Sequence, residues 1–216
     1  MKLLFLCSPG NPTAKAIPLA DIEAVAGSPE AKNVLVVVDE AYVDFSEKGS
    51  AVSILDRYPN VVVLQTLSKA FGLAAIRCGF CIGPPDVIQL MNNVKAPYNV
   101  NALTSRMALK AFDGADKLQQ NIQTLLEQRE FVAESLRKMD FVTKVYPSDS
   151  NFLLFRLDSN AKEVYRRMAD SGVVTRFRGT EIHCDECIRV TVGTPAENKS
   201  FLESIVKTYS SIKNSS

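Results

Sequence analysis

The stretch Val34-Leu-Val-Val-Val-Asp39 places a carboxylate directly after five consecutive apolar residues, four of them valine. Such a near-continuous run is typical of a strand buried on both faces of a parallel sheet. A second run of this kind, Val61–Leu64, leads into Thr66-Leu-Ser-Lys-Ala-Phe-Gly72, which sets a lysine beside two hydroxyls just past a strand. The chain therefore predicts a parallel sheet with reactive groups at the ends of its strands.

Strand-like and helix-like segments alternate around these two runs. Strands are expected over Lys2–Cys7, Val34–Val38, Val61–Gln65 and Gly79–Ile82, and helices over Leu19–Ala26, Pro85–Asn93 and Asn101–Phe112, with a helical turn or two at Val52–Arg57. This βαβα rhythm indicates an α/β domain whose helices cover the sheet.

The second half of the chain has a different pattern. A long amphipathic helix is predicted over Ala115–Met139. It is followed by expected strands at Phe141–Tyr146, Asn151–Leu157, Val173–Arg176 and Ile188–Val192, and by helices at Ala161–Ser171 and Pro195–Ile212. We therefore expect a large α/β domain over residues 1–114, an interdomain helix over 115–139 and a small α+β domain over 140–216.

Composition excludes several classes of protein. The chain has 216 residues, 25 of them basic and 24 acidic, and its net charge of +1 argues against nucleic acid as a partner. Its apolar runs are short and interrupted by charge, which argues against a membrane-spanning helix. The 46% apolar content is that of an ordinary globular protein.

The five cysteines do not suggest a disulfide framework, because their number is odd and their spacing irregular. Cys7, Cys78 and Cys81 lie in apolar runs and are expected to be reduced core residues of a cytoplasmic protein. The Cys-x-x-Cys of Cys184 and Cys187 lacks a second ligand pair for zinc. It also precedes a strand instead of opening a helix, so neither a metal nor a redox role is expected there.

Chemistry-bearing side chains follow three successive strands. A lysine such as Lys69, if buried, has a lowered pKa and can attack a carbonyl as the neutral amine; the alternative is a solvated lysine at a turn. Asp39 and Tyr42 follow the second strand, where the carboxylate either faces a protonated ring nitrogen or caps the next turn. Asn11 lies in a turn-forming segment after the first strand, and Arg77 follows the third.

This set of groups matches the needs of pyridoxal 5′-phosphate (PLP). The cofactor's aldehyde needs a lysine, and its pyridinium nitrogen needs an acidic partner. Its phenolic oxygen needs hydrogen-bond donors, and its phosphate needs hydroxyls and an arginine. Carboxyl ends of parallel strands meet at one edge of a sheet, which is where open α/β sheets bind ligands.

The chain resembles the fold-type I PLP-dependent aminotransferases over essentially its whole length. The resemblance rests on Ser8-Pro-Gly-Asn-Pro-Thr13, Val38-Asp-Glu-Ala-Tyr42, Thr66-Leu-Ser-Lys-Ala-Phe-Gly72, Pro97-Tyr-Asn-Val-Asn101 and Ile188-Arg-Val-Thr-Val-Gly193. The last two favour the histidinol-phosphate branch of that family. The resemblance implies the C-terminal portion of the mostly parallel large-domain sheet, followed by a smaller α+β domain.

The resemblance also assigns the cofactor site. It implies that Lys69 forms the Schiff base with PLP and serves as general acid and base for the 1,3-proton shift, while Asp39 pairs with the ring nitrogen. The phenolic oxygen and the phosphate are expected to be held by Asn11 and Tyr42, and by Thr66, Ser68 and Arg77, respectively.

Two further arginines are assigned to the substrate by the resemblance. Arg189 is expected to hold the carboxylate or phosphate of the substrate, and Arg176 matches a second phosphate-binding arginine, although the nearby Arg178 leaves that alignment open. Binding of two different anions suits the fixed fork of an arginine better than a lysine.

Two positions depart from the family's pattern. Ala14 stands where the family usually has glycine after Asn-Pro-Thr, and Ala75 stands where it usually has glycine before the phosphate-binding arginine. A positive φ at either position would add strain of about 1 kcal/mol.

The resemblance further implies that an N-terminal arm and the first half of the large domain precede the position of Met1. That part holds backbone amides for the cofactor phosphate, an aromatic that stacks on the ring and a tyrosine of the neighbouring subunit's site. We therefore expect weak PLP binding and little turnover by this chain alone. We also expect Lys2–Cys7 and Val34–Val38 to expose an apolar edge prone to association.

The implied function is transamination between L-histidinol phosphate and 2-oxoglutarate in L-histidine biosynthesis. The partners would be a small-molecule amino donor and an oxo-acid acceptor. The complete protein would be a cytoplasmic homodimer. One alternative is an aminotransferase for aromatic or other amino acids, and another is a catalytically inactive fragment. A sugar- or nucleotide-binding protein without PLP is disfavoured, because the chain has no G-x-G-x-x-G loop.

Overall fold

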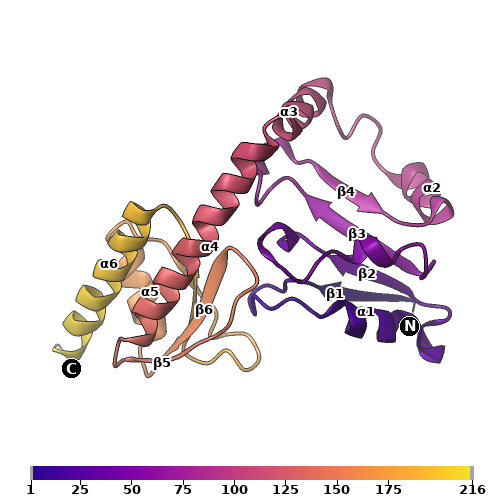
Figure 1. The fold of residues 1–216 in the computed structure, drawn as a ribbon. Coiled ribbons are helices and arrows are strands. Elements are labelled where there is room, and N and C mark those ends of the chain that lie inside the picture. Colours follow the sequence, from indigo (N-terminus) through magenta and orange to yellow (C-terminus); the bar gives the residue numbers. More distant parts are fainter. Residues whose placement is uncertain (1, 215–216) are drawn as a thin grey trace. The chain divides into compact units, whose positions relative to one another are not determined.

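The computed structural model describes residues 2–214, which form two compact units (Figure 1). The first comprises residues 2–11 and 15–122, and the second comprises residues 12–14 and 123–214. The division falls inside the long helix α4 (Ala115–Arg137), which carries the chain from one unit into the other. The sequence predicted this helix two residues longer, to Met139.

The first unit is built on a four-stranded, mostly parallel sheet. Its strands are β1 (Leu3–Cys7), β2 (Leu35–Asp39), β3 (Val61–Thr66) and β4 (Gly79–Ile82), which are adjacent in that order. The first three run parallel, and β4 is antiparallel to β3. This arrangement confirms the mostly parallel sheet expected from the two valine-rich runs.

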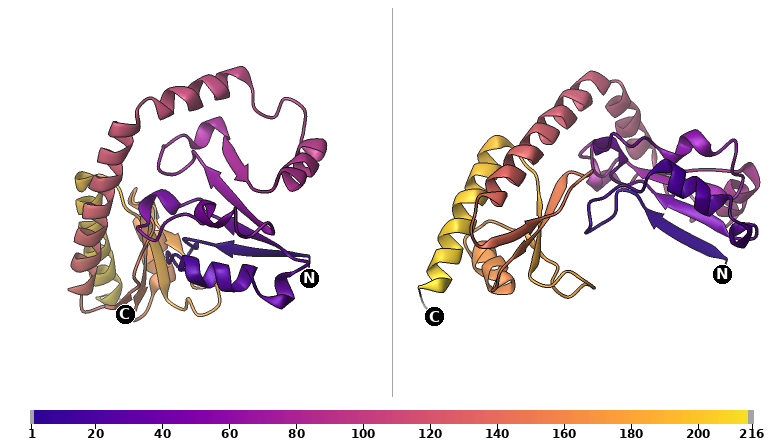
Figure 2. Two further views of the ribbon diagram at one scale, coloured as in Figure 1. Left: turned by 45° about the vertical axis from the view of Figure 1, so that its right-hand side comes forward. Right: turned by 60° about the horizontal axis from the view of Figure 1, so that its bottom comes forward.

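The interior strand β2 is buried on both faces, as its apolar run predicts. Val36 and Val38 pack with Ile22 of helix α1 (Leu19–Ala26) on one face, while Val37 is buried on the other. Figure 2 shows α1 alongside the sheet. The expectation of an exposed apolar edge at Val34–Val38 is therefore wrong, because β1 and β3 flank that strand.

Strand β1 lies at the edge of the sheet and is only half covered. Leu3 and Phe5 are 51% and 60% exposed, whereas Leu4 and Leu6, on the opposite face, are partly buried. The apolar edge expected at Lys2–Cys7 is thus present in the structure. A parallel edge strand with large apolar side chains offers an unpaired ladder to another strand.

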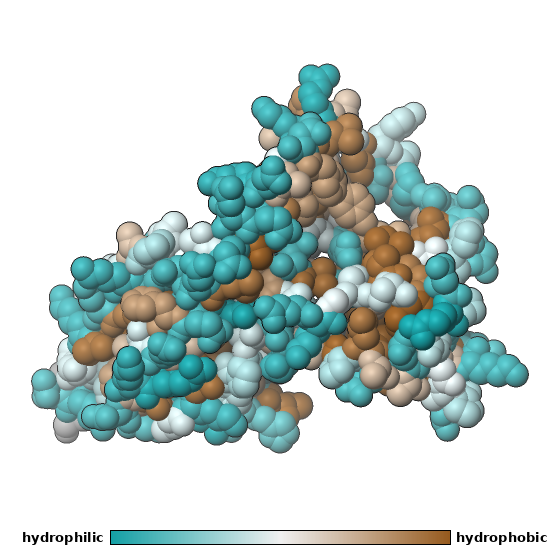
Figure 3. Space-filling model, in the orientation of Figure 1, coloured by the Kyte–Doolittle hydropathy of each residue, from teal (hydrophilic) through white to brown (hydrophobic). Residues whose placement is uncertain are grey.

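The remaining elements of the first unit are short helices. They are the 3-10 turns η1 (Pro29–Ala31), η2 (Val43–Phe45), η3 (Ala51–Ile54) and η4 (Ala74–Ile76), and helices α2 (Pro85–Val94) and α3 (Ala102–Phe112). Leu103 and Leu109 of α3 are exposed apolar residues. Figure 3 shows apolar surface in the region of this helix. Across residues 2–214, no helix combines the length and apolarity needed to cross a membrane.

The second unit contains an antiparallel sheet in the order β5-β6-β8-β7. Its strands are β5 (Val142–Val145), β6 (Phe152–Leu157), β7 (Arg176–Phe177) and β8 (Cys187–Thr191), and its helices are α5 (Ala161–Asp170), α6 (Pro195–Lys213) and the C-terminal part of α4. The strand predicted at Val173–Arg176 is displaced, because pairing with β8 begins only at Arg176.

The core of this unit lies between its sheet and its helices. Leu136 of α4, Val164 of α5 and Ile205 of α6 are fully buried against Phe155 and Ile188 of the sheet. The last helix begins with a capping box, in which Thr194 and Glu197 exchange side-chain to backbone hydrogen bonds. These apolar contacts fix β8, the strand that carries Arg189.

Candidate active site

The strand register gathers the first group of predicted residues at one edge of the sheet. Cys7 at the end of β1 pairs with Asp39 at the end of β2, and Asp39 pairs with Leu64 of β3. Asn11, Tyr42 and Lys69 therefore follow strand ends that lie in one row. This is the carboxyl edge, where parallel α/β sheets bind their ligands.

Asp39 is held at the end of β2 by both neighbouring segments. Its carboxylate accepts the backbone N–H of Ala41 (3.1 Å), and its main-chain oxygen accepts the N–H of Ser8 (2.9 Å). Burial, with a smaller contribution from the Asp39 charge, raises the pKa of the Cys7 thiol. The carboxylate thus lies in a fixed position beside the turn that contains Asn11.

Glu40 anchors the loop that follows Asp39, a role the sequence analysis did not foresee. Its side chain is buried (3% exposed). One carboxylate oxygen accepts the backbone N–H of Ala51 (2.6 Å). The other accepts the hydroxyl of Ser50 (2.6 Å) and the amide of Gln65 (2.9 Å). A second carboxylate following Asp39 at the end of an apolar run was the available signal, because a charged residue is buried only when it is paired.

The loop after β3 presents its hydroxyls and its lysine toward the same edge. The Thr66 hydroxyl accepts the backbone N–H of Ser68 (3.1 Å), and the two hydroxyl oxygens are 2.9 Å apart. The Lys69 amino nitrogen lies 5.3 Å from the centre of the Tyr42 ring. This contact is direct evidence that the loops after β2 and β3 converge.

Lys69 is exposed, as in the solvated alternative that the sequence left open. Its amino group is therefore accessible to the aldehyde of a cofactor beside the Tyr42 ring.

Arg77 lies at the same edge of the sheet, just before β4. It lies two residues before Gly79, which pairs with Thr66. Its backbone has a positive φ of 53°, and its guanidinium donates to the carbonyl of Ala74 (3.1 Å). The exposed guanidinium therefore contacts its own turn. An anion near Thr66 and Ser68 could attract it away from that turn.

The two unusual alanines differ in their backbone conformation. Ala14 is fully buried and has a φ of 63°, a left-handed conformation that costs an alanine about 1 kcal/mol. Ala75 lies in the 3-10 turn η4 and is not among the positive-φ residues. Strain from the missing glycine is therefore present at Ala14 and absent at Ala75.

The donor set at this edge fits PLP. It combines an amine, a carboxylate, a phenol and, for a phosphate, two hydroxyls and a guanidinium. The residues concerned are Lys69, Asp39, Tyr42, Thr66, Ser68 and Arg77, with Asn11 in the turn after β1. All of them belong to the first unit.

The two predicted substrate arginines belong to the second unit. Arg176 of β7 pairs directly with Arg189 of β8, and the Arg189 guanidinium lies 4.9 Å from the centre of the Phe152 ring. Arg178 forms an ion pair with Glu181 (2.8 Å). Like charges directly opposite each other destabilise a sheet, so this pair favours an anion between its side chains.

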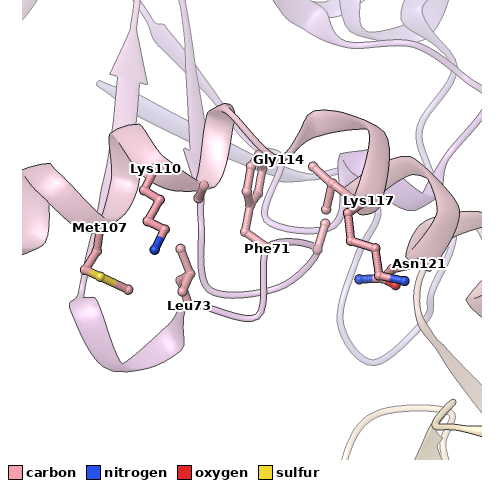
Figure 4. A pocket seen from close by; sticks show the side chains of 10 residues that line it. Phe71, Leu73, Met107, Lys110, Gly114, Lys117 and Asn121 are labelled. Atoms are coloured by element: carbon pink, nitrogen blue, oxygen red, sulfur yellow. The ribbon is translucent and has the colours of Figure 1, made fainter.

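A separate pocket of about 270 Å³ lies between the segment after Lys69 and the junction of α3 and α4. Figure 4 shows Phe71, Lys110, Lys117 and Asn121 among the residues that line it. Its lining includes none of the residues assigned to the cofactor or the substrate. We therefore place the candidate active site at the strand ends and not in this pocket.

Comparison with known proteins gives evidence on the family of this chain that is independent of the site geometry. Residues 1–205 match the family model described as aminotransferase class I and II. The histidinol-phosphate aminotransferase of Flavobacterium johnsoniae is 45% identical over 197 residues, which are 91% of this chain and 55% of that protein. The chain thus spans little more than half the length of this relative.

Solved structures of similar proteins share the fold. The histidinol-phosphate aminotransferase from Clostridium acetobutylicum superposes with a TM-score of 0.89 at 21% identity, over 95% of this chain and 63% of that one. The enzyme of the same name from Sinorhizobium meliloti, solved in complex with pyridoxal-5′-phosphate, gives 0.87 at 24% identity, over 97% and 58%. At these identities the likeness establishes the fold alone.

Proposed function

Since the chain belongs to the family of class I and II aminotransferases, we propose that it serves PLP-dependent transamination between L-histidinol phosphate and 2-oxoglutarate. This reaction would belong to L-histidine biosynthesis. The observation that carries the proposal is the convergence of Lys69 and Tyr42 beside the Asp39 strand end. The substrate in this proposal is taken from the name of the relatives, histidinol-phosphate aminotransferase.

Each residue at the strand ends has a definite task in this proposal. PLP, when bound, supplies the electron sink that allows an amino group to move. The Asp39 carboxylate keeps a proton on the ring nitrogen, and Lys69 carries protons to and from the reacting carbon. Tyr42 and Asn11 hold the phenolic oxygen.

The phosphate of the cofactor would be held by the segment between β3 and β4. Thr66 and Ser68 offer hydroxyls already aligned by their mutual hydrogen bond (2.9 Å). Arg77 would leave the Ala74 carbonyl and form charge-assisted hydrogen bonds, which are about twice as strong as neutral ones. Binding therefore orders a side chain that is exposed in the unliganded chain.

Recognition of the substrate anion would fall to the second unit. Arg176 and Arg189 form a cross-strand pair whose repulsion an anionic group relieves. A dianionic phosphate offers more acceptors to two guanidinium forks than a carboxylate does. The pair therefore supports a phosphorylated amine over an aromatic amino acid as substrate. A cytoplasmic homodimer is part of the same proposal and rests on the family resemblance.

The cofactor assignment can be tested without measuring turnover. The chain is incubated with PLP, reduced with borohydride and digested, and the pyridoxyl group is located by mass spectrometry. We expect the label on Lys69 and its loss in Lys69→Ala. Lys32→Ala is the matched control, since Lys32 is also exposed but precedes β2 at the opposite edge of the sheet. Labelling spread evenly over surface lysines would contradict the assignment.

The substrate assignment has its own test. Arg176→Ala and Arg189→Ala should each weaken binding of L-histidinol phosphate about 10–100-fold, because each removes a hydrogen bond between charged groups. Binding of unphosphorylated L-histidinol should change far less. Equal losses for both ligands would remove phosphate recognition from this pair, and tight binding of aromatic amino acids would favour the alternative substrate.

A further inference from the structure

The turn before β8 brings two cysteines together. The carbonyl of Cys184 accepts the N–H of Cys187 (2.9 Å), which closes a four-residue turn. Such turns hold their first and last Cα atoms within about 7 Å. Glu186, the third residue, has a φ of 54°, as a type II turn requires. Disulfides bridge Cα atoms roughly 4.4–6.8 Å apart, so the backbone places these cysteines in bridging range.

The side chains of this turn also meet. Cys184 and Cys187 are 7% and 0% exposed and belong to one apolar cluster with Leu154 and Tyr146. Both are free thiols. Burial first, and then contact with Cys187, raises the pKa of the Cys184 thiol. The two thiols therefore belong to one buried cluster and are not bridged.

Contacts on both sides hold the turn in this shape. The Glu186 carboxylate accepts the backbone N–H of Ala161 at the start of α5 (2.7 Å). The Arg156 guanidinium donates to the carbonyl of His183 (2.8 Å), and its contact with the Cys187 sulfur raises the pKa of the guanidinium. The Arg156 charge also partly offsets the rise in the pKa of the Cys184 thiol, which burial and the charge of Cys187 cause.

A second Cys-x-x-Cys in the same chain shows that spacing alone is not enough. Cys78 directly precedes β4, where its carbonyl accepts the N–H of Leu67 (3.2 Å), and Cys81 lies within β4. Three residues of extended strand span about 10 Å and point the first and last side chains to opposite faces. Cys78 and Cys81 cannot bridge without breaking the strand.

We propose that Cys184 and Cys187 form a reversible dithiol–disulfide pair that exchanges with low-molecular-weight disulfides. No helix follows these cysteines, and the turn supplies the proximity that a helix would give. The inference concerns this turn alone and does not depend on transamination.

The exchange proceeds in two balanced steps. The more exposed Cys184, as thiolate, attacks one sulfur of the external disulfide; a mixed disulfide forms, and the departing thiolate takes up the proton that Cys184 lost. Cys187, as thiolate, then attacks the Cys184 sulfur, and the second external thiolate leaves and is protonated in turn. Two protein thiols lose two electrons, and one external disulfide becomes two thiols.

The two pairs can be compared within one experiment. Trypsin leaves Cys184 and Cys187 together on peptide 179–189, and Cys78 and Cys81 together on peptide 78–95. The chain is equilibrated in glutathione buffers of increasing oxidised share, alkylated with N-ethylmaleimide and digested. We expect peptide 179–189 to become unalkylated and lighter by two hydrogens. Peptide 78–95 should keep separate alkyl or glutathione groups. In urea the difference between the peptides should vanish.

Single variants identify the attacking thiol. Cys187→Ser should stop at a stable glutathione adduct on Cys184, and exchange in the wild type should accelerate as the pH rises toward the raised pKa of that thiol. Three results would overturn the proposal. These are two alkyl groups on peptide 179–189 in the most oxidising buffer, equal oxidation of both peptides in the folded chain, and the absence of an adduct in Cys187→Ser. The wild-type comparison stands even if a variant fails to fold.

Discussion

Replacement of Glu40 tests whether the loop beyond Asp39 is held by one buried carboxylate. Glu40→Ala removes the acceptor of three donors, namely the Ala51 N–H, the Ser50 hydroxyl and the Gln65 amide. Glu40→Gln keeps the shape of the side chain and one carbonyl oxygen. The two variants therefore separate loss of the acceptors from loss of the charge.

The expected magnitudes follow from where the donors lie. Each hydrogen bond to a charged group contributes about 1.5–3 kcal/mol. In Glu40→Ala, the half-buried Ser50 and Gln65 can form hydrogen bonds with water instead. The N–H of the fully buried Ala51 is left without an acceptor. We expect the free energy of unfolding to fall by about 3–5 kcal/mol, as for other broken buried networks. Glu40→Gln should cost about 1–2 kcal/mol, because its oxygen can serve Ala51 and Ser50 can accept from its amide.

Urea unfolding measures both values if the probe reports on the first unit. Amide hydrogen exchange of residues 35–66 provides such a probe, since these amides include β2 and β3. With a slope of about 2 kcal/mol per molar urea, the midpoint for Glu40→Ala should fall by about 2 M. A loss below about 1 kcal/mol in Glu40→Ala, or equal losses in both variants, would show that this carboxylate does not hold the loop.

Three further predictions concern caps, charges and turns. Thr194→Ala should lower the free energy of unfolding by about 1 kcal/mol in urea titrations. Hydrogen bonds from Thr194 lower the pKa of Glu197. The contribution of that carboxylate to stability is therefore complete above pH ~4.3, and it is lost as the pH falls through the lower folded pKa. Tyr209→Phe should destabilise at neutral pH and progressively less in acid, since its hydroxyl foremost lowers the pKa of Asp158; an equal loss across the acid limb of a pH series would contradict this. Ala75→Gly should lower the thermal midpoint by the equivalent of about 0.5–1 kcal/mol, and a raised midpoint would show that this position needs glycine.

Local sequence patterns predicted the elements in which every residue has the same kind of surroundings. The run Val34–Val38 is apolar at every position because β2 has neighbours on both edges and cover on both faces. The run at Leu3–Cys7 looks similar in sequence, yet half of it is exposed. Apolar character shows that a segment can be buried, and only the fold shows what covers it.

Features that depend on distant partners were less accessible from the sequence. The sequence left Lys69 as either a buried or a solvated lysine, because exposure depends on which segments surround a loop. The buried carboxylate of Glu40 relies on Ser50 and Gln65, which are far from it in sequence. The pairing of Arg176 with Arg189 likewise depends on the β7–β8 register, which no local pattern reveals.

The strand order of the first sheet has a consequence for how the chain acquires its structure. Each of β2, β3 and β4 lies beside the strand that precedes it in sequence. Every new strand can therefore dock on the strand made before it, once the segment that connects the two has also been made. The strand-end residues from Asp39 to Arg77 would assemble in the order of their synthesis, before the residues that carry Arg176 and Arg189 are made.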